Sequence, residues 1–269
     1  MREDYLAPIG GEDGVRYLRG RLDAEPEFPE FEILIPQGAS ATQKAPFVLC
    51  LPILAGGEDL IWAIGKGMAD KGYAVAWTRR VSSALKPGQR GAELEQLFRR
   101  TVIHDRALLA WARTQPEIDQ ARMAVLGISF GGMVATALLA VEPDLRAGAI
   151  CLAGGDLPGL LHVTSEGRAS SWLRWRQEAD GIGRSELTRE IEREAVSDPA
   201  RMGVYLETDR VLMVTAAFDT VVPPHFQDVL WESLGRPARI TVPFGHYTAA
   251  LALGHILDAV DVFFRKRLT

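Results

Sequence analysis

The chain reads MAVLGISFGGMVATALLAV at residues 123–141, where two apolar segments flank a glycine-rich turn. The first segment, 123–128, has the length of a buried strand, and the second, 131–141, has the length of a buried helix. The turn carries the pattern G-x-S-x-G with Ser129 at its centre. Glycines permit a sharp turn that strains the serine backbone and exposes its hydroxyl. The pattern predicts a nucleophile at Ser129, and the alternative is a strand–helix turn that contains a serine by chance.

Short apolar runs alternate with segments of helical period on both sides of this stretch. Further strands are expected at 31–36, 47–54, 73–78, 149–153, 211–216 and 240–242. Further helices are expected at 59–71, 92–113, 224–234 and 248–266. Such alternation is typical of a mostly parallel sheet flanked by helices, so we expect an α/β fold. The alternation stops at about 156–209, which predicts a helical cap inserted into a single domain that spans 1–269.

The composition is that of an ordinary soluble globular protein. The chain has 269 residues, 30 Lys and Arg against 35 Asp and Glu, a formal net charge of −5 and 47% hydrophobic residues. The lack of a basic stripe argues against a nucleic acid partner. The N-terminus lacks the pattern of a secretory signal, and no apolar run reaches the roughly 18–20 residues of a membrane span. We therefore expect a cytoplasmic protein without a membrane span, and no sequence signal specifies an oligomeric state.

The two cysteines, Cys50 and Cys151, lie inside apolar runs that are expected to be buried strands. Buried reduced thiols of a cytosolic protein fit this pattern better than a disulfide does. Two cysteines are too few for a cysteine-based metal site, and no H-x-x-x-H pair or carboxylate cluster accompanies the histidines. We therefore expect no metal ion and no organic cofactor.

A serine nucleophile needs a base, and the base needs an acid that orients it. In the order Ser, acid, His, both follow the nucleophile at the carboxyl ends of later strands. Asp219 follows the strand expected at 211–216, and His246 follows the strand expected at 240–242. A second acid, Asp156, follows an earlier strand. Asp156 is a competing candidate for the orienting acid, or it opens the cap through a bond from its side chain to the backbone.

At these positions the sequence resembles the α/β-hydrolase superfamily, and the resemblance covers essentially the whole chain from about residue 31 onward. Members carry an acid in an aspartate, variable, valine-proline loop after the penultimate strand and a glycine-histidine pair before the last helix. The stretch DTVVP that starts at Asp219 is similar to the first motif, and Gly245-His246 to the second. The resemblance implies that Ser129 is the nucleophile, that His246 is the general base and then the acid, and that Asp219 orients the imidazolium.

Acyl transfer also requires main-chain N–H donors for the oxyanion. The resemblance implies one donor from Phe130, the residue after the nucleophile, and one from the loop after an earlier strand. Family members usually carry His-Gly and further glycines in that loop, whereas residues 51–57 here read LPILAGG. Pro52 has no N–H group, which leaves Ile53 or Leu54 as the second donor.

Three residues are candidates for the substrate pocket. Trp172 and Trp175 of the predicted cap either line an acyl pocket, since ligand pockets are mostly apolar, or pack the cap onto the core. Arg79, which with Arg80 follows the strand expected at 73–78, either receives a substrate carboxylate or remains solvated.

Together these residues predict a serine hydrolase that cleaves a small-molecule carboxylic ester through an acyl-enzyme. The same triad also serves the hydrolysis of thioesters, amides and C–C bonds, because all of these reactions share the acyl intermediate. A catalytically idle binding protein of the same fold is an alternative from another class, because a fold alone does not give function. The intact set of Ser129, Asp219 and His246 favours the enzyme.

Overall fold

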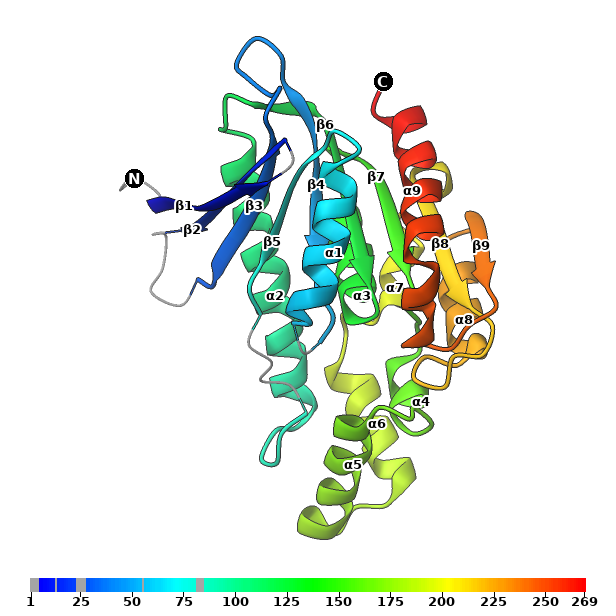
Figure 1. Ribbon diagram of the computed structural model, residues 1–269. Coiled ribbons are helices and arrows are strands. Elements are labelled where there is room, and N and C mark those ends of the chain that lie inside the picture. The colour runs from blue at the N-terminus through cyan, green and yellow to red at the C-terminus, as the bar shows by residue number, and fades with distance from the viewer. Residues whose placement is uncertain (1–4, 13, 23–27, 55, 81–84) are drawn as a thin grey trace.

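The computed structural model describes the chain except for residues 1–4, 13, 23–27, 55 and 81–84 (Figure 1). The described strands form one nine-stranded sheet in the order β1-β2-β3-β5-β4-β6-β7-β8-β9. The strands are β1 (Tyr5–Glu12), β2 (Val15–Arg21), β3 (Glu30–Pro36), β4 (Ala45–Leu51), β5 (Ala74–Thr78), β6 (Ile118–Ile128), β7 (Leu145–Cys151), β8 (Val211–Ala216) and β9 (Ala238–Val242). Neighbours from β5 to β9 pair in parallel, whereas β1, β2, β3 and β5 pair antiparallel.

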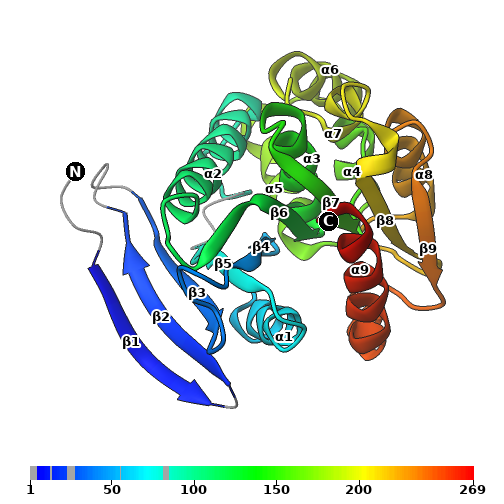
Figure 2. The same ribbon diagram turned by 90° about the horizontal axis from the view of Figure 1, so that it is seen from above.

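Helices cover both faces of the sheet. They are α1 (Glu58–Ala69), α2 (Gly91–Ala112), α3 (Phe130–Val141), α8 (Pro224–Ser233) and α9 (Leu253–Arg267), the last preceded by the 3₁₀ helix η2 (Thr248–Ala252). Figure 2 shows α1 and α9 on one face and α2, α3 and α8 on the other. One apolar core contains Ile64 of α1 and Val260 of α9, and the second contains Leu108 of α2 and Val134 of α3. The central strands are therefore buried on both faces, which explains their continuous apolar runs.

Between β7 and β8, in a stretch that is fully described, the chain forms a group of helices. They are α4 (Leu157–Leu161), α5 (Gly167–Asp180), α6 (Arg184–Glu194), α7 (Pro199–Gly203) and the 3₁₀ helix η1 (Thr208–Arg210). Figure 1 shows α5 and α6 beyond the carboxyl ends of the parallel strands, whereas α7 packs against α3 and α8. We name α4, α5 and α6 the cap helices.

The mostly parallel α/β sheet predicted from the alternation is confirmed. The prediction omits β1 and β2, because β1 contains Pro8, Gly10 and Gly11, which are depleted from strands, and β2 contains three arginines. It also extends β4 too far, since the strand ends at Leu51 and the following residues belong to a loop. β7 begins earlier than predicted, at Leu145.

Candidate active site

Ser129 lies at the turn between β6 and α3 in a strained backbone conformation. Its φ of 55° and ψ of −120° lie in a region that residues with side chains rarely adopt. A hydrogen bond of 2.8 Å from the Ser129 N–H to the Cys151 carbonyl holds the turn. A Cβ atom on Gly127 would overlap the carbonyl oxygen of Gly131, and a Cβ atom on Gly131 would overlap that of Leu51. Only glycine fits at either position, which explains the G-x-S-x-G spacing.

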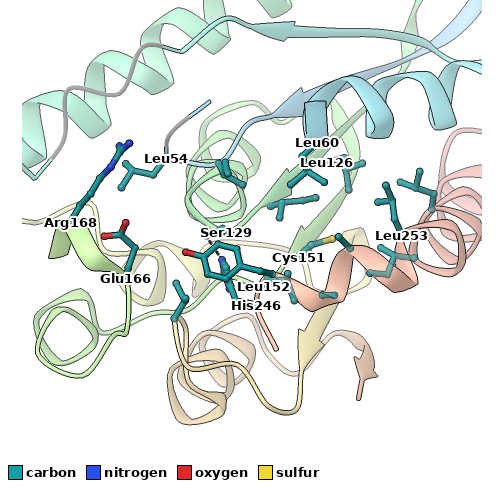
Figure 3. A pocket seen from close by; sticks show the side chains of 18 residues that line it. Leu54, Leu60, Leu126, Ser129, Cys151, Leu152, Glu166, Arg168, His246 and Leu253 are labelled. Atoms are coloured by element: carbon teal, nitrogen blue, oxygen red, sulfur yellow. Dashed lines mark hydrogen bonds between the residues drawn. The ribbon is translucent and has the colours of Figure 1, made fainter. Parts of the chain in front are cut away.

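His246 connects Ser129 to Asp219 through two hydrogen bonds. Its Nε2 atom lies 2.9 Å from Ser129 Oγ, and its Nδ1 atom lies 2.7 Å from Asp219 Oδ2. Asp219 follows β8 and His246 follows β9, and the N–H of Phe218 donates to the Phe244 carbonyl at 2.9 Å, which joins the two loops. Figure 3 shows Ser129 and His246 close together at one pocket. The structure thus brings together the three side chains that the sequence singles out.

The Asp219 carboxylate is buried, and both of its oxygens accept hydrogen bonds. Oδ1 accepts from the N–H groups of Val221 at 2.9 Å and Val222 at 2.8 Å, while Oδ2 faces His246. An ionised carboxylate can only accept, so Nδ1 of His246 carries the ring proton. Nε2 is then free to accept the proton of the Ser129 hydroxyl.

Asp156, the competing acid, has a different role in the structure. It precedes α4 with a φ of 57°, and its Oδ1 atom accepts a hydrogen bond from the Gly159 N–H at 3.2 Å. Its own N–H donates to Asp198 Oδ1 at 3.2 Å. Asp156 therefore caps the first of the cap helices, and Asp219 is the acid that reaches His246.

The expected oxyanion donors lie in two segments next to Ser129. Phe130 is the first residue of α3, so its N–H has no acceptor within the helix. Ile53 and Leu54 both line a pocket that contains Ser129. The Ile53 carbonyl accepts a hydrogen bond from the Gly56 N–H at 2.9 Å, which closes a tight turn after β4. Both Ile53 and Leu54 remain candidates for the second donor.

The structure corrects the expectation for Arg79. Its guanidinium pairs with Glu58 at 2.7 Å and with Glu30 and Glu32 at 3.2 and 3.5 Å. It is absent from the lining of both pockets that contain Ser129. Arg79 is therefore neutralised by carboxylates of neighbouring elements rather than presented to a substrate at Ser129.

The structure also corrects the expectation for Trp172 and Trp175, because neither is among the described residues that line the two pockets at Ser129. The Trp172 side chain is fully buried within the cap helices, where it packs with Leu187 and Ile191 of α6. Its Nε1–H donates to the Gln89 carbonyl at 2.9 Å. Trp175 is half-buried against the same cluster. Trp172 therefore packs α5 against α6 and ties the cap helices to Gln89, and Trp175 adds to the packing of the same cluster.

Among the residues that the structure describes, two cavities share Ser129 in their lining. The first, named here the α9 pocket, has a volume of about 260 Å³ and lies between α1 and α9. Its lining includes Leu60 of α1, Cys151 of β7, and Leu253 and Leu257 of α9 (Figure 3).

The second cavity, named here the cap pocket, has a volume of about 170 Å³ and lies between α2, α3 and the cap helices. Its lining includes Leu97 and Phe98 of α2, Met133 of α3, Leu160 of α4 and Ile191 of α6.

The sequence prediction names Leu54, Ser129 and Phe130 of the cap pocket but omits the part of its lining that comes from α2. Leu94, Leu97 and Phe98 lie on the apolar face of the helix expected at 92–113, which the prediction places over the sheet. The 22 residues of α2 span about 33 Å, whereas a strand of 7 residues such as β4 spans about 23 Å. The start of α2 therefore extends past the sheet toward the cap (Figure 1). A predicted helix that is longer than the neighbouring strands therefore indicates that its first residues lie beyond the sheet, where they can line a pocket.

Residues 66–234, more than half of the chain, match the model of the family described as the prolyl oligopeptidase family. The chain belongs to the prolyl oligopeptidase family. The matched segment contains Ser129 and Asp219 and ends before His246. This member of the family is a serine hydrolase of the α/β-hydrolase superfamily, as its sequence predicts.

Nearly the whole length of this protein aligns with solved structures that have the same fold. The acetyl xylan esterase from Paenibacillus sp. R4 is 16% identical with a TM-score of 0.70, over 96% of this chain and 88% of that one. Acetyl xylan esterase 1 from Thermoanaerobacterium sp. JW/SL YS485 is 15% identical with a TM-score of 0.70, over 95% of this chain and 87% of that one. Identities this low establish the fold alone.

A curated relative matches a shorter part of the chain. The uncharacterized protein YdjC of Bacillus subtilis (strain 168) is 28% identical over 97 residues, which are 36% of this chain and 81% of the relative.

Among the residues that the structure describes, no three His, Cys, Asp or Glu side chains lie together in a group that could hold a metal ion. Of the described helices, none has both the length and the apolar character needed to cross a membrane. Cys50 and Cys151 are buried free thiols, as the sequence predicts. Burial raises the pKa of Cys151 to about 12, so the thiol that lines the α9 pocket is uncharged.

Proposed function

We propose that this protein hydrolyses carboxylic esters of small molecules, with Ser129 as nucleophile, His246 as general base and then acid, and Asp219 as orienting acid. The observation that carries the proposal is the unbroken chain of hydrogen bonds from Asp219 through His246 to Ser129, with lengths of 2.7 and 2.9 Å. The likeness in fold to two acetyl xylan esterases supports an ester as the substrate. Each step uses only groups of this chain and water.

In the acylation step, Ser129 Oγ attacks the ester carbonyl carbon while His246 Nε2 takes the hydroxyl proton. The carbonyl oxygen becomes an oxyanion, which accepts hydrogen bonds from the N–H of Phe130 and the N–H of Ile53 or Leu54. The imidazolium then donates its proton to the ester oxygen. The C–O bond breaks, the alcohol leaves, and Ser129 retains the acyl group.

In the deacylation step, water takes the place of the alcohol. His246 Nε2 removes a proton from the water as its oxygen attacks the acyl carbon, and the second tetrahedral oxyanion uses the same main-chain donors. The imidazolium returns a proton to Ser129 Oγ as the bond to the acyl carbon breaks. In both steps the Asp219 carboxylate stabilises the charged imidazolium and holds its orientation.

We further propose that the segment at about 156–209 acts as a cap within one domain. Leu160 of α4 and Ile191 of α6 line the cap pocket, and Glu166 lines both pockets at Ser129. A substrate at Ser129 would therefore lie against residues from this segment.

Covalent labelling tests the nucleophile. A fluorophosphonate probe is expected to label the peptide that contains Ser129 in the wild-type protein and to leave the Ser129→Ala variant unlabelled. Turnover of p-nitrophenyl hexanoate by Ser129→Ala is expected to fall by roughly 10⁴–10⁶, because the triad acts as a unit. Turnover by the folded variant within about tenfold of wild type would refute the triad.

Peptide cleavage is a second candidate function, because the family is described as that of a prolyl oligopeptidase. An ester and an amide with the same acyl group separate the two candidates. We expect p-nitrophenyl hexanoate to be accelerated more than hexanoyl p-nitroanilide, when each kcat/KM is divided by the uncatalysed rate constant. The opposite ranking would favour peptide cleavage.

A further inference from the structure

Ser129 lies where the α9 pocket and the cap pocket meet, because it lines both cavities. Leu54, Glu166 and Val221 also line both cavities, so the junction lies beside the nucleophile. A substrate whose reacting carbon is at Ser129 has a separate cavity available on each side. The two volumes together fall within the range of small-molecule sites, roughly 300–1,000 Å³.

We propose that the substrate is an ester with two uncharged apolar arms, the acyl arm in the cap pocket and the alcohol arm in the α9 pocket. This inference rests on the proposed function and extends it to a substrate class and an orientation.

The position of His246 assigns the arms to the cavities. The tetrahedral carbon carries Ser129 Oγ, the oxyanion, the leaving oxygen and the acyl chain. The leaving oxygen must receive its proton from His246 Nε2, and His246 and Tyr247 line the α9 pocket but not the cap pocket. The oxyanion faces the N–H of Phe130. The acyl chain takes the remaining direction, into the cap pocket.

The lining of the cap pocket selects an uncharged acyl chain. Most of the lining is apolar, with Leu97, Phe98 and Met133 contributed by α2 and α3. The charged groups are two carboxylates, Glu95 and Glu166, and the described lining contains no Lys, Arg or His. An acyl chain with its own carboxylate would lose its hydration and meet two carboxylates, and none of the described lining residues offers it a cation as a partner.

Both carboxylates are held in place by hydrogen bonds. Glu95 accepts from the hydroxyl of Ser197 at 2.7 Å, from its N–H at 3.1 Å and from Arg99 at 2.6 Å. Glu166 accepts from the N–H of Ala169 at 2.7 Å at the start of α5. The two acidic groups are therefore fixed features of the pocket wall.

The α9 pocket has a polar end and an apolar end. Figure 3 shows Glu166 and Arg168 on one side of Ser129 and Leu60 and Leu253 on the other. The apolar end lies between helices α1 and α9. An alcohol arm that leaves from His246 and extends toward these helices is therefore apolar as well.

Two matched variants test the assignment. Leu97→Trp fills the cap pocket and Leu253→Trp fills the α9 pocket, and both leucines are half-buried helix residues outside the triad. We would measure kcat/KM on two series of substrates. One series varies the acyl group of p-nitrophenyl esters from acetate to laurate, and the other varies the alcohol of hexanoate esters from methyl to octyl.

Leu97→Trp is expected to lower kcat/KM for the longest acyl chains by about tenfold or more relative to acetate, since one methylene group that a pocket cannot hold changes kcat/KM by roughly 10–200-fold. Its profile along the alcohol series is expected to match that of wild type. Leu253→Trp is expected to lower kcat/KM for the longest alcohols and to leave the profile along the acyl series as in wild type. The assignment would be overturned if Leu97→Trp changed the alcohol series and Leu253→Trp the acyl series. It would also be overturned if each variant changed kcat/KM equally in both series. Leu97→Ala, which is expected to favour longer acyl chains, tests the same pocket if Leu97→Trp does not fold.

A pair of acyl groups tests the charge of the cap pocket. Wild-type kcat/KM on mono-p-nitrophenyl adipate, which ends in a carboxylate, is expected to be at least about tenfold below that on p-nitrophenyl hexanoate. Equal values would overturn the uncharged acyl arm. If the proposed function itself is wrong, wild type is expected to cleave neither series of esters, and the fluorophosphonate is expected to leave Ser129 unlabelled.

Discussion

The Arg80 guanidinium forms an ion pair with the Asp105 carboxylate, which is fully buried on α2. The hydroxyl of Thr78 donates to the same carboxylate at 2.9 Å, and Arg80 Nη1 donates to the Pro52 carbonyl at 2.9 Å. The guanidinium carbon also lies 5.8 Å from the centroid of the Phe130 ring. Arg80 therefore contacts both segments that carry the proposed oxyanion donors, and Asp105 fixes it there.

The first prediction concerns Arg80→Lys. A lysine retains the charge that pairs with Asp105 but lacks the planar fork that also reaches Pro52. Loss of a whole oxyanion donor lowers kcat by about 10²–10³, so a displaced loop is expected to lower kcat by about tenfold with little change in KM. Kinetics on p-nitrophenyl hexanoate and the melting temperature are measured together. Arg79→Lys, at the neighbouring arginine whose shortest ion pairs are to the exposed Glu30 and Glu58, is the control and should match wild type.

A lower melting temperature of Arg80→Lys with unchanged kcat would contradict this prediction. That result would mean that the Arg80–Asp105 pair supports the fold without positioning the loop.

The second prediction separates the two acids. Asp219→Asn is expected to lower kcat by about 10²–10⁴, because an amide can donate to His246 and stabilise the wrong tautomer. Asp156→Asn is expected to lower kcat by less than about tenfold, because asparagine caps a helix as well as aspartate does. The two kcat values are measured side by side. A large loss for Asp156→Asn beside normal turnover by Asp219→Asn would reassign the orienting acid.

The three residues of the proposed triad could be predicted to lie together because each depends on chemistry that is local in the sequence. The turn at Ser129 needs glycines at fixed positions to avoid main-chain collisions, so the spacing is visible in the sequence. Asp219 and His246 directly follow strands, and parallel strands place their carboxyl ends at one edge of a sheet. The alternation of strands and helices therefore also indicates that these side chains lie close together.

The surroundings of the residues proposed for the substrate pocket could not be predicted in the same way, because the positions of their side chains depend on partners that are far away in the sequence. Trp172 faces the interior of the cap because Leu187 and Ile191 on another helix bury it there. Arg79 is held outside the two described pockets at Ser129 because Glu30 and Glu58, from two other elements, pair with it. Nothing in the immediate sequence of Trp172 or Arg79 encodes these contacts.

The third prediction concerns the cap tryptophan. Trp172→Ala is expected to destabilise the protein by about 3–5 kcal/mol, because it leaves a large cavity and removes the donor to the Gln89 carbonyl. Trp175→Ala, at a half-buried position of the same helix, is the matched comparison and should destabilise less. Both variants should retain the wild-type ranking of acyl chain lengths, because neither residue belongs to the described lining of the α9 pocket or the cap pocket. A changed ranking would return Trp172 to the acyl pocket.

The last prediction rests on the ion pair between Arg176 of α5 and Glu190 of α6. The guanidinium, of which 2% is exposed, donates to both carboxylate oxygens at 2.7 Å. Glu190 also accepts from the N–H of Gly91, the first residue of α2, at 3.3 Å. The hydrogen bond from Arg176 outweighs burial and holds the pKa of Glu190 below its usual value. The pair thus joins two cap helices to each other and to the body of the fold.

Glu190→Gln is expected to cost about 2 kcal/mol at neutral pH, between the values for exposed and buried pairs, and to lower the melting temperature by roughly 4 °C. A carboxyl whose pKa is lower in the folded state adds stability above its unfolded pKa of about 4.3, and this stability is lost as the pH falls through the folded value. The difference in melting temperature between wild type and Glu190→Gln should therefore be constant from about pH 5 to 8 and shrink below about pH 4. Glu192→Gln removes the same charge from an exposed position of α6 and should show a smaller difference. A difference that persists undiminished at acid pH would show that the Glu190 carboxylate contributes through packing rather than through its charge.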